Sequence, residues 1–441
     1  MKKFLLIPLV IVLVSGLIFG GCKAAPKAPE EILIGLPAAV TGGAAGFGKG
    51  GIFGYRAAVE DINKLGGIYI EEYGSKLPVK LIVVDNESNP LKAGTLAEDL
   101  ILRDKAKFLV NVGPLDFNPA MAEVAERHKI PHMGGPGPYE SWQAMRTEVT
   151  PPWEYSWIIS FAIATPAAEG DFRHGKLGYS MFDVWLGALK DIIGETNKKV
   201  ALLASDDPDG RGWYHAFAPQ AQGIGCETYR TEEEFGLVPM ETTDFTSIIM
   251  EWKDANCELL WSNSPASFYG AFARQAHTLG YYPKQVFATR GGLFYTDIQA
   301  WGGDLPNGVC NEMFWHPSIE GCRGIGDTTP MSLHERWVEE TGLPKHTVMG
   351  WCYAIAQVLF DAIERAGTLD GAEINKALAE TDMITIYHRV VFDEEQYSRV
   401  PVAFGQWQKT DKPWVWENPI VYSSHDFMPA TADLIFPIPY E

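Results

Sequence analysis

The chain has 441 residues, a formal net charge of −20, and 46% hydrophobic and 21% charged residues. That length exceeds a single compact core and predicts two lobes of ordinary domain size. A nucleic-acid binder needs a basic face that releases counterions from phosphates, and no stretch rich in Lys and Arg occurs. The composition therefore excludes nucleic acid as a partner.

The N-terminus predicts an export signal followed by a lipid anchor. Lys2 and Lys3 precede an unbroken apolar run over 4–14, and small residues then lead to Cys22. A basic start, a short apolar core and small residues are typical of a secretory signal. The cysteine after two glycines resembles the lipobox of bacterial lipoproteins, although Phe19 stands where Leu is usual. Residues 1–22 are thus a predicted lipoprotein signal peptide with lipidated Cys22; a plain membrane anchor with an incidental cysteine is the alternative.

Residues 23–30, rich in Ala and Pro, are a predicted tether. No later apolar run approaches the roughly 20 residues of a membrane span. We therefore expect the rest of the chain to be soluble, outside the cytoplasmic membrane, facing the periplasm or exterior.

The predicted elements alternate between strand and helix in two series. The first series has strands at 32–36, 79–84, 108–112 and 130–133, and helices at 52–63, from 90 onward and at 119–128. The second has strands at 199–205, 227–232, 258–262 and 285–289, and helices at 213–222, 244–254 and 266–279. Later helices are expected at 332–341, 348–366 and 372–380, before a β-like aromatic tail at 390–422. The glycine-rich stretch 41–51 is expected to be a flexible loop.

Two βαβ series of similar length predict an α/β protein with two doubly wound parallel-sheet lobes. Open parallel sheets bind ligands beyond the carboxyl ends of their strands. Two such lobes facing each other would clamp a ligand by closing about a hinge.

Short motifs in a fixed order carry a family resemblance. They are Ile34-Gly35-Leu36-Pro37 with Thr41-Gly42, Ala57–Asn63 with Gly66-Gly67-Ile68, Asp85 with Asn89-Pro90, Asp206-Asp207 with Gly210-Arg211-Gly212, Thr243-Asp244-Phe245, and Arg274-Gln275-Ala276 with Gly280. Together they resemble the Leu/Ile/Val-binding family of ABC-transporter substrate-binding proteins, over about 32–407.

The resemblance implies a type I periplasmic binding fold with a hinge of three crossovers. Lobe one would comprise 31–158 and 312–385, and lobe two 159–311 and 386–441. It also implies a lipoprotein that delivers a small ligand to the membrane permease of an ABC importer of the branched-chain amino acid class. An extracytoplasmic sensor feeding a signalling partner is the alternative, which genomic adjacency to permease genes would decide.

Several motifs are incomplete. The glycine-rich stretch almost fits a phosphate-binding loop, but Gly50 stands where a hydroxyl must hold magnesium. Asp207 and Asp209 match part of a calcium loop, but Ala216 occupies the position of its bidentate Glu. Nothing assembles a nucleophile with a base. We therefore expect no enzyme activity, no cofactor and no metal.

Five cysteines follow the signal peptide, and an odd number leaves at least one free thiol. Cys310 and Cys322 flank a polar loop at the second crossover, so a disulfide is predicted there; it would contribute about 3 kcal/mol. Cys352 is a predicted buried thiol, and pairing of Cys226 with Cys257 stays open.

Family members that hold an α-amino acid tend to use hydroxyls in lobe one, and a Tyr and an acidic residue in lobe two. Here Asp116, Phe117 and Asn118 occupy the first lobe-one loop, and the second loop, around Gly135, has no hydroxyl. The residue types of the first lobe thus depart from the family pattern.

The second lobe departs as well, because Asp209 replaces the tyrosine and Arg290 follows the strand that usually leads to the acidic residue. A guanidinium suits a carboxylate, so the hypothesis is an amino-acid-like ligand, an organic acid, or an aromatic or amide compound. Alternatively, Arg290 forms an ion pair within the protein.

Aromatic residues at or near predicted strand ends are candidate ring walls for such a ligand. The candidate ligand-binding residues of this kind are Trp213, Phe294 and Trp315, together with Ser262 at the end of a strand. Ordinary core packing is the alternative for each ring.

Overall fold

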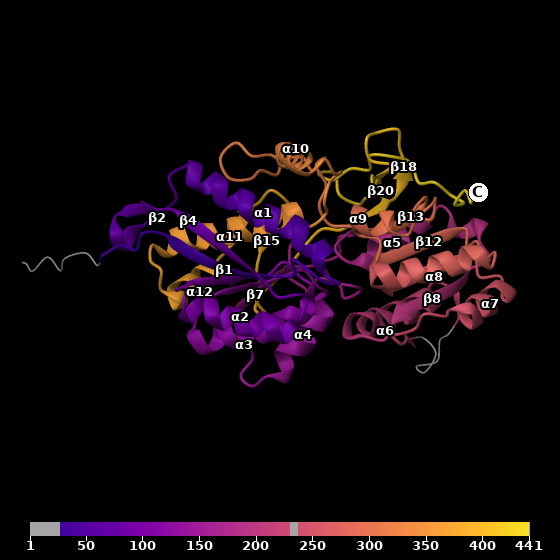
Figure 1. Cartoon of the computed structure of the whole chain (residues 1–441), viewed down its shortest axis with the longest axis horizontal. Coiled ribbons are helices and arrows are strands. Elements are labelled where there is room, and N and C mark those ends of the chain that lie inside the picture. The colour runs from indigo at the N-terminus through magenta and orange to yellow at the C-terminus, as the bar shows by residue number, and fades with distance from the viewer. Residues whose placement is uncertain (1–26, 230–236, 441) are drawn as a thin grey trace, which may run out of the picture.

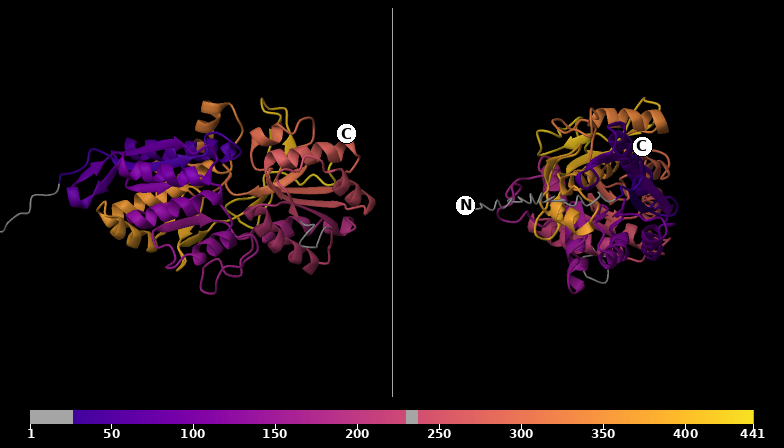
Figure 2. Two further views of the ribbon diagram at one scale, coloured as in Figure 1. Left: turned by 60° about the horizontal axis from the view of Figure 1, so that its bottom comes forward. Right: turned by 90° about the vertical axis from the view of Figure 1, so that its left-hand side faces the viewer.

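The computed structural model describes residues 27–229 and 237–440, which form two lobes side by side along the longest axis (Figure 1, Figure 2). The predicted signal peptide and lipidated Cys22 lie outside the described residues. Within that part of the chain, no helix has the length and apolar character needed to cross a bilayer.

The first lobe is built on a parallel sheet. Its described strands run in the order β16, β7, β6, β5, β1, β4 and pair in parallel throughout. They are β1 (Ile32–Ala38), β4 (Val79–Asp85), β5 (Phe108–Val110), β6 (His132–Gly134), β7 (Ser156–Ser160) and β16 (Tyr397–Arg399). Phe108 and Val110 face one core and Leu109 the other, because side chains alternate along a strand.

Helices cover both faces of this sheet (Figure 1). They are α1 (Ala45–Lys64), α2 (Pro90–Leu102), α3 (Asn118–His128), α4 (Tyr139–Glu148), α11 (Met349–Ala366) and α12 (Gly371–Ala379), whereas α10 (Pro330–Thr341) packs on α1 through Trp337 and Phe53. Helices α1 and α11 pack in one core, whereas α2 and α3 pack in the core on the opposite face.

The glycine-rich stretch was expected to be a loop, and that expectation is wrong from Ala45 onward, where α1 begins. Its glycines permit close packing. An added Cβ would lie 1.9 Å from the carbonyl oxygen of Ala39 at Gly48, and 2.1 Å from that of Met349 at Gly54. A glycine inside a helix costs only about 1 kcal/mol, which is small beside such overlaps.

The second lobe has a mixed sheet, in the order β10, β8, β11, β12, β13, β17, β20, with β9 also paired to β8. Pairing is parallel as far as β13, and β17 pairs antiparallel with both of its neighbours, β13 and β20. The strands are β8 (Lys199–Ser205), β9 (Glu227–Tyr229), β10 (Leu237–Val238), β11 (Leu259–Ser264), β12 (Gln285–Arg290), β13 (Val309–Met313), β17 (Ala403–Gln406) and β20 (Ile420–Tyr422).

Helices again lie on both faces of this second sheet. They are α5 (Met181–Leu189), α6 (Pro208–Gly223), α7 (Thr246–Asp254), α8 (Ala266–Thr278) and α9 (Tyr295–Gln299). Helices α5 and α6 pack in the large core, and α7 and α8 in a separate core.

Short elements complete the described fold. Three strand pairs are β2 (Ile68–Ile70) with β3 (Ser75–Leu77), β14 (Asp382–Ile384) with β15 (Arg389–Val391), and β18 (Gln408–Lys409) with β19 (Trp416–Glu417). The 3₁₀ turns are η1 (Glu71–Tyr73), η2 (Leu115–Phe117) and η3 (Ile193–Glu195).

The described chain crosses between the lobes within 161–180, 314–329 and 400–402. The last crossing differs from the sequence expectation, which put 386–441 in lobe two. Strand β16 pairs in parallel with β7, so the chain remains in lobe one as far as Arg399. A three-residue strand carries too short a pattern to reveal its sheet.

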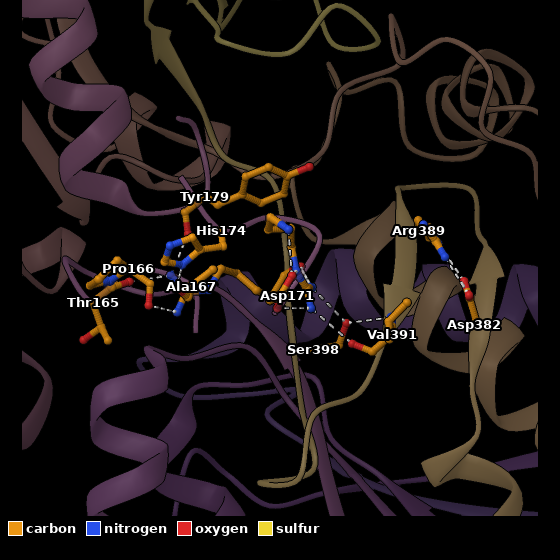
Figure 3. A network of polar contacts seen from close by, with 12 residues as sticks. Thr165, Pro166, Ala167, Asp171, His174, Tyr179, Asp382, Arg389, Val391 and Ser398 are labelled. Atoms are coloured by element: carbon orange, nitrogen blue, oxygen red, sulfur yellow. Dashed lines mark hydrogen bonds and ion pairs between the residues drawn. The ribbon is translucent and has the colours of Figure 1, made fainter. Parts of the chain in front are cut away.

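Two buried arginines, Arg173 and Arg399, connect the first and last crossings through hydrogen bonds, and Figure 3 shows the segments around them. Arg173 is 2% exposed; it donates to the carbonyl oxygens of Val391 and Arg399 and pairs with Asp171 at 2.8 Å. We refer to this network, including Arg399, as the crossover arginine cluster.

Arg399 donates to carbonyl oxygens of the first crossing, those of Thr165, Pro166 and Tyr179. On the same segment, the N–H groups of 163–165 donate to the carboxylate of Glu140 at 2.8–3.1 Å. The beginning of the first crossing is thus fixed to lobe one.

The predicted disulfide between Cys310 and Cys322 is wrong, since both are free thiols, as are the other described cysteines. Cys310 is buried in β13 and its thiol lies 3.7 Å from the carbonyl oxygen of Gly308, whereas that of Cys322 lies 3.4 Å from the carbonyl oxygen of Tyr387. Spacing along the chain could not reveal that the two thiols face different surroundings.

Candidate functional site

Polar residues gather where the parallel strands of the second sheet end. Ser205 ends β8, Asn263 lies one residue before the end of β11, Arg290 ends β12, and Glu312 lies near the end of β13. Because these strands are parallel neighbours, their carboxyl ends meet at one edge. We call these residues, with Asp207 and Asp209 at the start of α6, the sheet-edge cluster.

Arg290 is the centre of the sheet-edge cluster. Its backbone has φ of 57°, a left-handed conformation that is uncommon for a residue other than glycine and that recurs at functional sites. Its Nη1 and Nη2 donate to the two carboxylate oxygens of Asp207 at 2.9 and 2.8 Å, and Nη1 also donates to Asp209 at 3.2 Å. Arg290 thus forms the ion pair that the sequence left as an alternative.

Asp207 and Asp209 differ in their protonation behaviour. Burial raises the pKa of Asp207, but the paired guanidinium of Arg290 outweighs it and holds the pKa below its usual range. Asp207 also caps α6, accepting from the N–H of Gly210 at 2.9 Å. Burial raises the pKa of Asp209, and the charge of Arg290 offsets this only in part.

Asp116 is a residue of the first lobe that lies close to the sheet-edge cluster. It lies in η2, beyond β5, and burial followed by the nearby charge of Asp209 raises its pKa to about 6, while the charge of Arg290 acts in the opposite direction. Three residues that the sequence predicted for the site, Asp116, Asp209 and Arg290, are therefore brought together from both lobes.

Two buried acceptors in the sheet-edge cluster have no hydrogen-bond partner. Glu312, 3% exposed, accepts from the backbone N–H of Arg290 through Oε1, and its Oε2 is unpaired. Burial raises the pKa of Glu312 to about 7. Asn263, also 3% exposed, donates to Thr289 Oγ1 at 3.4 Å, and its Oδ1 is unpaired. Unpaired buried acceptors are costly unless a ligand or water supplies a donor.

Aromatic rings form a second contact between the lobes. The ring of Phe294, just beyond β12, meets that of Phe47 in α1 edge-on at 4.8 Å and stacks on His346 at 4.7 Å. A Cβ added at Gly46 would lie 2.6 Å from the Phe294 ring. Phe294 is thus at the junction of the lobes, and we call this contact the aromatic seam.

Other predicted site residues have structural partners inside lobe one. Asn118 Oδ1 accepts from Asn111 Nδ2 at 2.7 Å and from the N–H of Gly135 at 3.0 Å, which joins the two loops of this lobe. Phe117 is buried in the core beneath α2 and α3. A Cβ at Gly135 would lie 2.3 Å from the nitrogen of Gly113, so the two loops touch through their backbones.

Three predicted residues of the second lobe and its crossing lie within packed interiors. Trp213 is fully buried and stacks on Phe217 at 4.8 Å, Ser262 is fully buried beside Ser264, and Trp315 donates from Nε1 to the carbonyl oxygen of Ile386. Core packing, the alternative reading for the rings, accounts for both tryptophans.

The sequence interpretation missed Asp207, Asn263 and Glu312. Asp207 belongs to the quoted Asp-Asp motif, and its place as the helix cap before Pro208 was readable. Asn263 and Glu312 are single polar residues near the ends of short apolar strands, and that position is the signal that could have marked them. Among the described residues, no group of acidic, His or Cys side chains is arranged to hold a metal ion.

Known proteins resemble this chain along most of its length. A family model described as periplasmic binding protein matches residues 31–412. The Leu/Ile/Val-binding protein homolog 3 of Brucella melitensis is 26% identical over 364 residues, covering 80% of this chain and 84% of the relative.

Solved structures share the fold. The branched-chain amino acid transporter substrate-binding protein LivJ of Streptococcus pneumoniae, in complex with isoleucine, has a TM-score of 0.66 at 16% identity, covering 88% of this chain and all of its own. A solute-binding protein of an ABC transporter from Rhodopseudomonas palustris, in complex with 3,4-dihydroxybenzoic acid, has a TM-score of 0.65 at 19% identity, covering 93% and 99%. The predicted two-lobed α/β fold is confirmed.

Proposed function

The chain belongs to the periplasmic binding protein family and is a substrate-binding protein of the branched-chain amino acid ABC transporter type, and from that premise we propose that its ligand binds between the sheet-edge cluster and Asp116. Proteins of this family bind small molecules, deliver them to a permease and do not transform them, as the sequence predicts for this chain. The site would consist of Asp116 from lobe one and of Asp209, Arg290 and Phe294 from lobe two.

One observation carries the proposal: Asp116 of lobe one interacts electrostatically with Asp209 and Arg290 of lobe two. A ligand held there touches both lobes, so it stabilises the closed arrangement relative to an open one by its differential contacts. A permease can then distinguish loaded from empty protein by lobe position.

The ligand class follows from the charges in the site. The two solved neighbours hold isoleucine and 3,4-dihydroxybenzoic acid, so the fold accepts both amino acids and aromatic acids. In this chain the terminal nitrogens of Arg290 already donate to Asp207 and Asp209, which disfavours an organic acid bound through that guanidinium. We infer an amine-bearing ligand of amino-acid size.

Thermal shift and calorimetry with amino acids, amines, aromatic acids and amides test the proposal. A binder should raise the melting temperature, and small-angle scattering should show a more compact protein with it than without it. A binder that leaves the Asp116→Asn and Asp209→Asn variants with unchanged affinity would place the ligand elsewhere.

We also propose that Cys22 carries the lipid that holds the protein at the membrane. The basic start, apolar run and small residues before Cys22 support it. The Cys22→Ala variant should move from the membrane fraction to the soluble fraction, and mass spectrometry should find diacylglyceryl on the wild type alone. A wild type without lipid would refute this anchor.

A further inference from the structure

We propose that the natural ligand is an organic cation without a carboxylate, that is, a primary amine, an amidine or a guanidine. This inference rests on the proposed site and goes further, because an α-amino acid carries a carboxylate as well as an ammonium. It is derived from the charges, the unpaired atoms and the donors of the described residues around that site.

Carboxyl groups outnumber cationic groups among the described residues of the site. Four carboxyl groups, those of Asp116, Asp207, Asp209 and Glu312, surround the single guanidinium of Arg290. Arg290 is bonded to Asp207 and Asp209, so Asp116 and Glu312 have no cationic hydrogen-bond partner. A cationic ligand would supply the missing positive charge.

The unpaired buried atoms of the sheet-edge cluster are acceptors. Glu312 Oε2 and Asn263 Oδ1 belong to side chains that are 97% buried, and both lack a donor. They lie beside Arg290 and Asp209 respectively, since Glu312 accepts from the N–H of Arg290 and Asn263 interacts with the Asp209 carboxyl. An ammonium has three N–H donors and a guanidinium has five, which fits this shortage of donors.

An inorganic cation fits the cluster less well. Within residues 27–229 and 237–440, acidic, His and Cys side chains nowhere converge as a group of metal ligands. An organic cation can reach separated acceptors because its donors are spread over several atoms.

Several donors that could bind a ligand carboxylate are occupied in both lobes. In lobe one, the backbone N–H groups of Gly113, Gly135 and Gly137 donate to Asn111, Asn118 and Ser160, and the loop sequences 113–118 and 134–138 contain no Ser or Thr. In lobe two, Arg290 is bonded to carboxylates. A carboxylate placed here would face Asp116, Asp209 and Glu312, and like charges in a site of low dielectric repel strongly.

Matched pairs that differ only by the carboxylate test the inference. Calorimetry and thermal shift would compare 3-methylbutylamine with leucine, phenethylamine with phenylalanine, and agmatine with arginine. In the pair whose side chain fits, the decarboxylated compound should bind at least tenfold more tightly. Amino acids that bind as tightly as their amines would overturn the inference while leaving the proposed function intact. Benzoates that bind instead would overturn both the inference and the amine-bearing ligand class, and would leave only the ligand-binding role.

A panel in which nothing binds at millimolar concentration would overturn both the inference and the proposed site. Two variants locate the effect for the best amine: Asp116→Asn should weaken its binding at least tenfold, whereas Asp104→Asn, on the exposed surface of the same lobe, should match the wild type. Equal affinities in the two variants would contradict the inference.

Proton release provides an independent readout. Calorimetry of the amine at pH 6.5 in phosphate and in ACES, two buffers with different ionisation enthalpies and no primary amine, should give different apparent enthalpies, because a bound cation displaces protons from buried carboxyl groups. The sign should correspond to protons leaving the protein. Proton uptake would refute a cation at these carboxyls.

Discussion

The crossover arginine cluster and the sheet-edge cluster use the same guanidinium group with different acceptors. Arg399 donates to neutral backbone carbonyls, and Arg173 to carbonyls and one carboxylate, Asp171. Arg290 donates to two carboxylates of one helix start. Carbonyl acceptors fix the path of the chain, whereas carboxylate acceptors set the net charge of a site. Arginine therefore holds the crossing segments in place in one region and sets the electrostatics of the site in the other.

The largest effect is expected from breaking the crossover arginine cluster. Arg173→Met leaves Asp171 mostly buried without its partner and frees two carbonyls, so the free energy of unfolding should fall by about 3–5 kcal/mol. Arg389→Met is the matched control in the same view, because Arg389 pairs with Asp382 at the surface (Figure 3). That change should cost less than about 1 kcal/mol.

Denaturant unfolding followed by tryptophan fluorescence would measure both variants. Similar losses for Arg173→Met and Arg389→Met would mean that burial of the crossover arginine cluster contributes nothing to stability. Ligand affinity of folded Arg173→Met should stay near the wild-type value, since the sheet-edge cluster is built from other elements.

The next effect concerns closure at the aromatic seam. An alanine at Gly46 would place its Cβ 2.6 Å from the Phe294 ring, whereas a Cβ at Gly43 meets nothing within 4 Å. Gly46→Ala should therefore weaken ligand binding about tenfold by disfavouring the closed lobes, which corresponds to about 1.4 kcal/mol.

Gly43→Ala should bind like the wild type. Gly46 lies in the first turn of α1, where alanine favours the helix, so the variant should still fold. Calorimetry gives the affinity, and scattering gives the compactness with ligand. Unchanged affinity in Gly46→Ala would show that ligand binding does not need the seam to close.

Most of the fold could be predicted from the sequence because its strands and helices have strong patterns. β8 was predicted with the bounds it has, and α8, α11 and α12 to within one residue. The failures have local causes. Gly48 and Gly54 allow close helix packing, but a stretch rich in glycine was interpreted as a loop. Strand β16 has three residues, too few for the sequence to indicate the sheet in which it pairs.

The candidate site stays a prediction. Asp116, Asp209 and Arg290 were singled out because the family resemblance places ligand contacts in the loops after the parallel strands, and the structure brings these three residues near one another. The partner of Arg290 could not be deduced, since Asp207 is 83 residues away and only the folded sheet brings the two together. Trp213 and Trp315 were chosen for their place near strand ends, but the side on which a ring packs depends on tertiary structure.

A pH titration distinguishes the two clusters, because the pKa of Asp116 beside the sheet-edge cluster is raised whereas that of Asp171 in the crossover arginine cluster is lowered. Burial and the nearby charges of Asp209 and Asp207 raise the pKa of Asp116 to about 6, against the charge of Arg290, which lowers it. Burial also raises the pKa of Glu312, in the sheet-edge cluster. A cationic ligand requires ionised carboxyls, and the pKa of Glu312 is about 7, so affinity should level off only above roughly pH 8 and should fall by up to about tenfold per unit for each carboxyl below pH 6. Asp116→Asn should reduce this dependence.

Stability of the empty protein should respond in the opposite direction. A raised carboxyl pKa means that the folded state binds more protons than the unfolded chain, so this group contributes more stability as the pH falls from 7 towards 5. In contrast, the pKa of Asp171 is lowered because the Arg173 guanidinium outweighs its burial, and that contribution is lost only in stronger acid. Affinity that rises on acidification would contradict a cation at Asp116.

The smallest expected effect concerns Cys310 and Cys322, the two thiols for which the sequence predicted a disulfide. Cys310 lies on β13, the strand that also carries Glu312, and Cys322 lies on the second crossing, with Tyr387 as its neighbour. A disulfide between them would contribute about 3 kcal/mol, so adding reductant would lower the melting temperature by roughly 5 °C or more. Because both thiols are free, the melting temperature should change by less than about 1 °C. Alkylation of the denatured, unreduced protein should modify both cysteines, and protection of the pair would show that the crossing is tied covalently to the sheet that carries the site.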